Sequence, residues 1–151
     1  MVDVLTDKIR LSREGILQAT GQPLDPVIVR GQIEGAFMQA AGRLTMDELV
    51  WPIGGKLLTD SPAACKIPTA ADMPKVFNVL SVHPCSNRVE ALFQSKGIDE
   101  TPLLLAIYGH RAIGQALQYT LRSGAADGSR LDTSATPENI LTALEGACPV
   151  P

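Results

Sequence analysis

Two long segments with helical periodicity constrain the fold of this chain more than any other feature of its sequence. The first follows a loop marked by Pro23 and Pro26, where Asp25 can cap a helix and Pro26 suits its first turn. From there apolar residues recur at the spacing of one helix face: Ile28, Ile33, Ala36, Phe37, Ala40 and Ala41. The second segment runs from about Glu100 to Leu121 and is strongly apolar from Leu103 onward. We therefore expect two long helices.

Shorter segments that favour extended structure lie before and between the two helical segments. We expect a hairpin from Val2–Leu5 and Lys8–Leu11, a second hairpin from Asp47–Trp51 and Lys56–Thr59, and single strands at Val76–Val82 and Ala91–Phe93. The second hairpin is favoured by Gly54-Gly55, which tolerates the positive φ angles of a tight turn. Because strands and helices do not alternate regularly, the sequence predicts an α+β fold.

The 151 residues are the size of one domain, and we expect a single domain over residues 1–151. Aromatic residues make up 4% of the chain, which leaves the core to Leu, Ile, Val and Ala. Residues 123–135 are predicted to form a flexible linker to a short helix at 137–145, with Thr136 as its cap. The predicted sheet begins at residue 2 with no loop before it, and we therefore expect a truncated domain.

Composition argues against several functional classes. The net charge is −3 and the charges are scattered, so there is no basic stripe for nucleic acid. No apolar run approaches the ~20 residues of a membrane span, and the first residues have no signal-peptide character. Cys65, Cys85 and Cys148 are isolated, and neither His83 nor His110 has a partner at ligand spacing, so we expect a cytoplasmic protein with reduced thiols and no metal ligands of its own.

Two features leave a structural and a functional interpretation open. Gly31, Gly35 and Gly42 weaken the first helix, which indicates either close packing of a neighbouring element or a groove for a ligand. Asp99 and Glu100 stand at the start of the second helix, where carboxylates favour the positive end of the helix dipole. Alternatively, the start of the helix positions Glu100 for chemistry. The irregular, proline-rich stretch Ser61–Pro74 is of a kind that often covers or lines a site.

Several segments, taken in order, resemble one known family. They are GQIEGAFMQAAG (Gly31–Gly42), LTMDELVW (Leu44–Trp51), LLTDSPAACKIPTAADMP (Leu57–Pro74), FNV (Phe77–Val79), SKGIDETPLLLA (Ser95–Ala106) and RLDTSATPENIL (Arg130–Leu141). Together they are similar to the C-terminal portion of the molybdopterin-binding large subunit of the xanthine dehydrogenase and aldehyde oxidase family of molybdenum hydroxylases. The resemblance covers residues from about 2 to 145.

The resemblance implies a function and a set of site residues. Members of this family hydroxylate a purine, another heterocycle or an aldehyde with oxygen from water, using a molybdenum–molybdopterin cofactor. By position, Glu100 matches the family's general base, Gln32 matches a glutamine that contacts the cofactor, and Lys96, Gly97, Ile98 and Asp99 match the loop that approaches it. FAD and [2Fe–2S] clusters are expected only on missing parts or partner chains.

The resemblance also leaves two hypotheses open. In the first, the chain works only with the missing N-terminal part of the subunit and an iron–sulfur and FAD partner. In the second, it is a non-catalytic remnant that acts as a self-associating or binding module, because faces that met the missing part are expected to be apolar.

Overall fold

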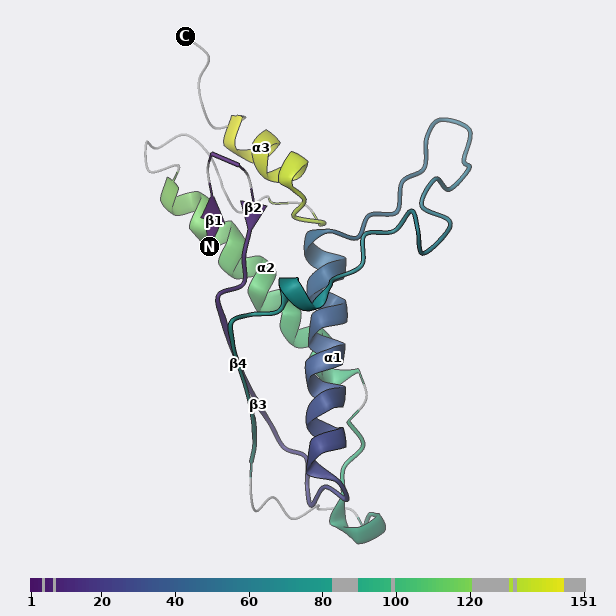
Figure 1. Ribbon diagram of the computed structural model, residues 1–151, viewed down its shortest axis with the longest axis vertical. Helices are drawn as coiled ribbons and strands as arrows, with labels where there is room; N and C mark the ends of the chain where they lie inside the picture. The colour runs from purple at the N-terminus through teal and green to yellow at the C-terminus, as the bar shows by residue number, and fades with distance from the viewer. Residues whose placement is uncertain are drawn as a thin grey trace.

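The computed structural model describes residues 1–3, 5–6, 8–82, 90–98, 100–120, 131 and 133–145. In chain order these residues form β1 (Val2–Asp3), β2 (Lys8–Ile9), β3 (Arg13–Gln18), α1 (Pro26–Thr45), η1 (Ala70–Asp72), β4 (Val76–Ser81), η2 (Leu92–Gln94), α2 (Thr101–Thr120) and α3 (Pro137–Glu145). The η elements are single turns of 3-10 helix. The mixture of helices and short sheets confirms the α+β prediction (Figure 1).

The helices begin where the local capping signals place them. Asp25 accepts hydrogen bonds from the backbone N–H groups of Val27 (2.9 Å) and Ile28 (3.2 Å), which satisfies two donors at the start of α1. Thr136 accepts one from Asn139 at the start of α3 (3.3 Å). Helix α2 begins at Thr101, one residue after the predicted start. Local sequence therefore sets where these helices begin.

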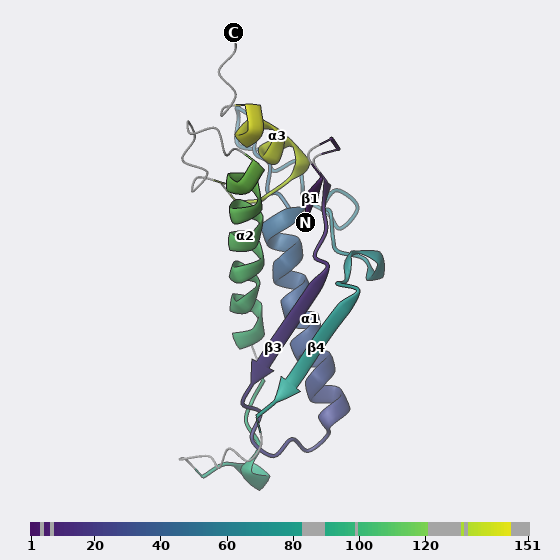
Figure 2. The same ribbon diagram turned by 90° about the vertical axis from the view of Figure 1, so that its left-hand side faces the viewer.

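A two-stranded parallel sheet lies beside the two long helices (Figure 2). Strands β3 and β4 pair in parallel from Arg13 opposite Val76 to Gln18 opposite Ser81, and α1 lies in the connection between them. Strand β4 confirms a prediction, whereas β3 was not predicted. Its sequence, Arg-Glu-Gly-Ile-Leu-Gln, has no apolar alternation, and pairing with β4 supplies the reason for its extended conformation.

The two faces of this sheet have different surroundings. Ile16 is buried, and Phe77 and Val79 pack against the same cluster on the helix side. On the outer face Leu17 and its register partner Leu80 are 68% and 62% exposed. An isolated pair of strands is only marginally stable, so the helices must support this sheet in the present chain.

Apolar side chains form two buried clusters. The first contains Ile16, Ile33, Phe37, Ala40, Ala41 and Ala106, and it joins β3, α1 and α2. The rings of Phe37 and Phe77 meet there with centroids 5.3 Å apart. The second contains Ile113, Leu117, Ala135 and Ile140, and it joins α2 to α3. Aliphatic residues supply most of both clusters, as the low aromatic content predicts.

Three predictions of local structure need correction or qualification. The strand predicted at Ala91–Phe93 is wrong, because this segment enters the 3-10 turn η2, in which Phe93 and Gln94 have positive φ angles (50° and 60°). The first predicted hairpin is confirmed in shortened form by the pairing of β1 with β2. The second hairpin turns at Gly54-Gly55, with Leu58 N–H bound to the Val50 carbonyl (2.9 Å), but it contains no strand in the described residues.

The predicted linker 123–135 falls mostly outside the described residues. Its last part is described, and there Ser134 and Ala135 are buried against the end of α1. The Ser134 hydroxyl donates to the Arg43 or the Asp47 carbonyl (2.9 and 2.7 Å), and Ala135 N–H donates to the Leu44 carbonyl (2.7 Å). These contacts hold the segment before α3 against α1.

Candidate functional site

The start of α2 presents Glu100 at an exposed position between two anchored residues. Ile98 is half-buried and packs against the first apolar cluster, and Pro102 is fully buried. The Glu100 carbonyl accepts a hydrogen bond from Leu103 N–H (3.0 Å), which closes the turn that leads into the helix. The backbone on both sides of Glu100 is therefore held, while its carboxylate is free to reach a partner outside the described residues.

The loop before α2 is tied to the segment that leads into α1. Lys96 N–H donates to the Thr20 carbonyl (3.1 Å), Gln22 N–H donates to the Gln94 carbonyl (3.0 Å), and Gly21 forms a bridge with Ser95. The Lys96 N–H is thus occupied by the protein itself. Within the described part of the chain, the N–H groups of Gly97 and Ile98 have no hydrogen-bond acceptor, so they remain available as donors.

Gly21 makes this junction possible, and the sequence analysis did not single it out. Its φ angle is +65°, and a Cβ atom there would collide with the Gln94 carbonyl and lie 3.1 Å from the Lys96 nitrogen. Only glycine fits such a position without strain. Thr20 beside it is buried and its hydroxyl hydrogen-bonds that of Ser81. A glycine two residues before Pro23 was the available signal for a turn.

Gln32 lies on an exposed face of α1 that has little side-chain cover. Gly31 and Gly35 are on the same face, and a Cβ built at either would meet nothing within 4 Å among the described residues. Ile33 points the other way and is 1% exposed. Of the two interpretations of the glycines, close packing holds for Gly42, where a Cβ would collide with Pro68. Gly31 and Gly35 instead leave an open surface.

The structure brings Gln32 and the loop before α2 to one region of the molecule. Ile33, next to Gln32, and Ile98, two residues before Glu100, belong to the same apolar cluster. Gly97 is exposed and open on its Cα side, and Lys96 is half-buried. Asp99, the remaining predicted site residue, lies outside the described residues. Of the predicted residues that the structure describes, Gln32, Gly97 and Glu100 are exposed, and Lys96 and Ile98 are half-buried.

The predicted site residues that the structure describes line neither of two hollows in the molecule. One, of about 470 Å³, opens between α1 and α2 and is lined by Gln39, Ala40, Arg43, Leu44, Asp47, Leu103, Leu104 and Ile107. The other, of about 480 Å³, is lined by β1, β2, the second half of α1 and neighbouring loop residues. Gln32 and Glu100 line neither hollow.

Polar groups also lie inside the packing of β3 against α2. Burial raises the pKa of Glu14 above its ordinary value, and a Cβ at Gly109 of α2 would lie 3.9 Å from the Glu14 Oε1. Gln18 Oε1 and His110 Nε2 are buried without a hydrogen-bond partner in the described part of the chain. Among the described residues there is no group of three or more His, Cys, Asp or Glu side chains able to hold a metal ion. No described helix is long and apolar enough to cross a membrane.

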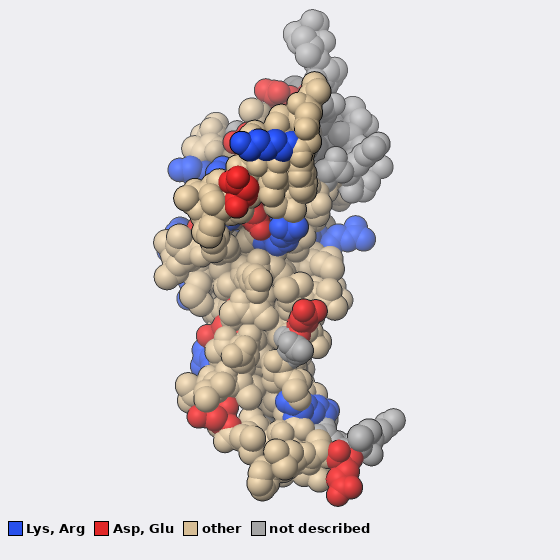
Figure 3. Space-filling view, turned by 90° about the vertical axis from the view of Figure 1, so that its right-hand side faces the viewer, with Lys and Arg blue, Asp and Glu red and all other residues tan. Residues whose placement is uncertain are grey.

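Charge does not single out this face for a polyanion. Figure 3 shows acidic and basic side chains of both signs scattered over one side of the molecule, with wide uncharged areas between them. On α1 the exposed Arg30 pairs with Glu34 (2.7 Å), four residues along the helix. Such exposed pairs stabilise a helix only slightly, so they serve local structure rather than ligand binding.

A family model and curated proteins of known function match this chain. Residues 1–74 match the family model described as a molybdopterin cofactor-binding domain. Xanthine dehydrogenase/oxidase of Gallus gallus is 40% identical over 94% of this chain, and the nicotinate hydroxylase hnxS of Emericella nidulans is 35% identical over 95%. This chain spans 10% of the length of each of these relatives.

Solved structures agree with this at the level of the fold. Quinoline 2-oxidoreductase from Pseudomonas putida 86 superposes with a TM-score of 0.78 at 23% identity, over 95% of this chain and 17% of that one. The Cu,Mo-CO dehydrogenase superposes with the same TM-score at 20% identity, over 97% of this chain. The fold predicted from the resemblance is thereby confirmed. This chain belongs, as a segment of about a tenth of its relatives' length, to the xanthine dehydrogenase family of molybdenum hydroxylases, whose cofactor is molybdenum–molybdopterin.

Proposed function

We propose that this chain supplies one side of the cofactor site and the general base of a molybdenum hydroxylase of the xanthine dehydrogenase type. In this proposal the enzyme hydroxylates a purine, another nitrogen heterocycle or an aldehyde, and the chain acts only together with the rest of its subunit. The observation that carries the proposal is the set of backbone contacts between Gln94–Lys96 and Thr20–Gln22. These contacts join the loop before Glu100 to the segment that leads into the helix of Gln32.

The residues present fit part of a molybdopterin site. The Gln32 amide and the unpaired N–H groups of Gly97 and Ile98 are the donors that would hold the cofactor, and the open glycine face of α1 leaves room for it. When bound, the cofactor supplies the oxygen transfer and takes up the electrons. In this proposal the remaining contacts come from outside the described residues, since these groups line neither of the two hollows described above.

The role proposed for Glu100 is to accept a proton at a carboxylate oxygen. A general base must lie within hydrogen-bond reach of the group that it deprotonates, and a rigid mount improves that geometry. Ile98 and Pro102 provide this mount, while the side chain itself is exposed to whatever completes the site. The second interpretation of Glu100, a helix-start carboxylate without chemistry, predicts no such role.

A chimeric enzyme separates these interpretations. This chain replaces the matching segment of Gallus gallus xanthine dehydrogenase, and we measure molybdenum content by elemental analysis and turnover of xanthine and nicotinate. We expect the Glu100→Gln chimera to retain molybdenum and to lose turnover by about 100-fold or more, the usual contribution of a general base. Glu34→Gln, which removes a half-buried carboxylate on α1 that pairs with Arg30, is the control and should leave turnover intact. Unchanged turnover in the Glu100→Gln chimera would contradict the proposal.

A non-catalytic, self-associating module is the second candidate function. It is favoured by the exposed pair Leu17 and Leu80 and by the unpaired outer edges of β3 and β4 among the described residues. Sedimentation of the isolated chain tests it, because this candidate requires concentration-dependent dimers or larger species.

A further inference from the structure

Residues 47–68, which we name the arm, leave the body of the molecule at the end of α1 and return to the same place. At the start of the arm, Asp47 N–H donates to the Gly42 carbonyl (2.9 Å), and the Asp47 carboxylate pairs with Arg43 (3.2 Å). At its end, Pro68 lies directly against Gly42. Figure 1 shows the arm as a long blue-to-teal loop that projects away from the helices and the sheet.

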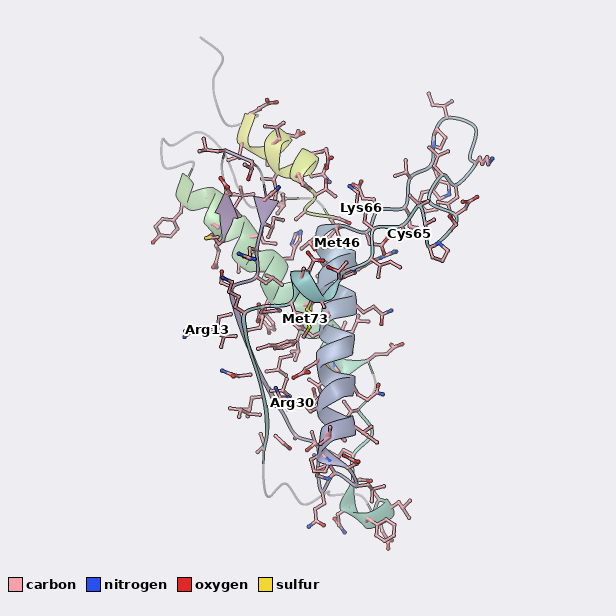
Figure 4. All side chains as sticks on the ribbon, in the orientation of Figure 1. Arg13, Arg30, Met46, Cys65, Lys66 and Met73 are labelled. Atoms are coloured by element: carbon pink, nitrogen blue, oxygen red, sulfur yellow. The ribbon has the colours of Figure 1, made fainter. Side chains whose placement is uncertain are left out.

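The arm is held by its own hydrogen bonds rather than by a core. Leu58 N–H donates to the Val50 carbonyl (2.9 Å), Val50 N–H donates to the Thr59 hydroxyl (3.2 Å), and Gly55 N–H closes a turn onto the Pro52 carbonyl (3.1 Å). Further along, the Cys65 thiol donates to the Thr59 carbonyl (3.4 Å). Figure 4 places Cys65 and Lys66 on the returning limb, and Met46 where α1 ends. These bonds give the arm a defined shape.

The apolar side chains of the arm are turned outward. Trp51 is 56% exposed, Ile53 is fully exposed, and Leu58 and Ile67 are 53% and 61% exposed; Leu49 and Val50 are about two-fifths exposed. Isolated exposed apolar residues are ordinary, but several on one ordered projection indicate an interaction surface. The apolar residues of the arm include the only tryptophan of the chain, a residue type enriched in the centres of interfaces.

The exposed area of the chain is larger than that of a compact monomer of the same mass. A compact monomer of 16.0 kDa exposes about 7,400 Å², whereas this chain exposes 10,678 Å². The difference, on the order of 3,000 Å², is several times the ~800 Å² that a standard interface covers on each partner. Because the exposed area is a sum over the whole chain, it does not show where a contact lies. The exposed apolar residues of the arm locate the contact. An excess of this size fits burial within a larger folded unit.

We infer that the arm binds an apolar groove on the remainder of a molybdopterin-binding subunit and thereby attaches this chain to that subunit. This inference rests on the proposed function, since it takes its partner from the same family. The length of the partner supports the choice: this chain spans 17% of the quinoline 2-oxidoreductase chain that it superposes on. The contact lies at the end of α1 opposite to Gln32, because the arm begins at Asp47, after the last turn of the helix.

Trp51 provides a direct test, because it is the only tryptophan in the chain. The full chain is labelled with 5-fluorotryptophan and mixed with Gallus gallus xanthine dehydrogenase from which the matching segment has been removed. We expect the ¹⁹F resonance of Trp51 to shift and to saturate at one equivalent. Ile53→Ser should weaken this binding by tenfold or more, whereas Tyr119→Ser, at another exposed site on α2, should not change it. Circular dichroism verifies that both variants are folded.

Three results would overturn the inference. The first is that sedimentation detects no complex. The second is a complex in which the Trp51 resonance does not move. The third is a resonance that shifts with the concentration of the chain alone, because a second copy would then be the occupant. The readout needs neither cofactor nor turnover. If the arm docks but the chimeric enzyme is inactive, the proposed function is refuted and this inference stands. If the chimeric enzyme is active but the Trp51 resonance does not move, this inference is refuted and the proposed function stands.

Discussion

The body of the molecule and the arm use apolar residues in opposite ways. In the body, Ile33 and Phe37 are each 1% exposed and pack in a cluster that joins a strand and two helices. In the arm, Trp51 is 56% exposed and Ile53 is fully exposed, and hydrogen bonds such as Leu58 N–H to the Val50 carbonyl maintain the shape. Burial stabilises the body, whereas the arm leaves its apolar surface for another molecule.

This difference means that the body and the arm should respond differently to substitution. A change in the body should lower the free energy of unfolding of the whole chain. A change in the arm should leave that quantity almost unaltered and act on binding. The following predictions test this contrast with matched pairs, from the largest expected effect to the smallest.

The largest effect is expected from Phe37→Ala. Phe37 is 1% exposed and contacts the ring of Phe77, so its truncation removes buried surface and leaves a cavity, at a cost of about 3–5 kcal/mol. Ile53→Ala on the arm removes surface that is already in water and should change stability by less than ~0.5 kcal/mol. Urea unfolding followed by far-ultraviolet circular dichroism measures both. Equal losses would show that the arm is part of the core.

An intermediate effect is expected from Gly21→Ala. The residue has a φ angle of +65°, and the new Cβ would collide with the Gln94 carbonyl, so backbone strain and overpacking together should cost at least about 2 kcal/mol. Gly55→Ala is the matched variant in the arm: its φ angle is +77°, but a Cβ there meets nothing within 4 Å. It should cost only the backbone strain of about 1–2 kcal/mol. The same unfolding experiment compares them, and a Gly55 variant as unstable as the Gly21 variant would contradict the separation.

The smallest effect concerns Glu14 and depends on pH. Burial raises the pKa of Glu14 above 4.5 in the folded chain, so the folded state holds the proton more tightly than the unfolded state. The contribution of Glu14 to the free energy of unfolding is therefore fully present below the pKa that Glu14 has in the unfolded chain. It is lost as pH rises through the pKa that Glu14 has in the folded chain. Glu14→Gln should therefore stabilise the chain at neutral pH and lose that advantage below about pH 4.

Thermal unfolding over this range of pH provides the measurement. Asp60→Asn, at an exposed carboxylate of the arm, is the control and should follow the parent chain throughout. If Glu14→Gln stabilised the chain equally at acid and neutral pH, ionisation of Glu14 would be ruled out as the cause.

Predictions from sequence succeeded where the decisive interaction is local. Asp25 and Thr136 cap their helices through bonds that span two or three residues, so both helix starts could be inferred from neighbouring positions. Strand β3 was missed because its conformation depends on β4, which follows about sixty residues later and pairs with it only in the folded chain. The apolar residues of Ala91–Phe93 favour a strand, yet the positive φ angles of Phe93 and Gln94 turn the chain there.

The candidate site shows the same division. Its residues were found by resemblance, and their roles remain predictions. The contact of Thr20 and Gly21 with the loop before Glu100 could not be predicted from local sequence patterns, because the two segments are more than seventy residues apart. It also had no means of showing that Gly42 is packed against Pro68 while Gly31 and Gly35 are open.

The sequence by itself determined the two long helices, the caps of α1 and α3, the α+β class and the relationship to the molybdenum hydroxylases, because each is written in residues close together or in the order of short segments. Only the tertiary structure decided that Gln94–Lys96 lies against Thr20–Gln22 and that the arm carries its apolar side chains outward. Both arrangements depend on which distant segments meet, and that outcome follows from the joint burial of the whole chain rather than from any one segment.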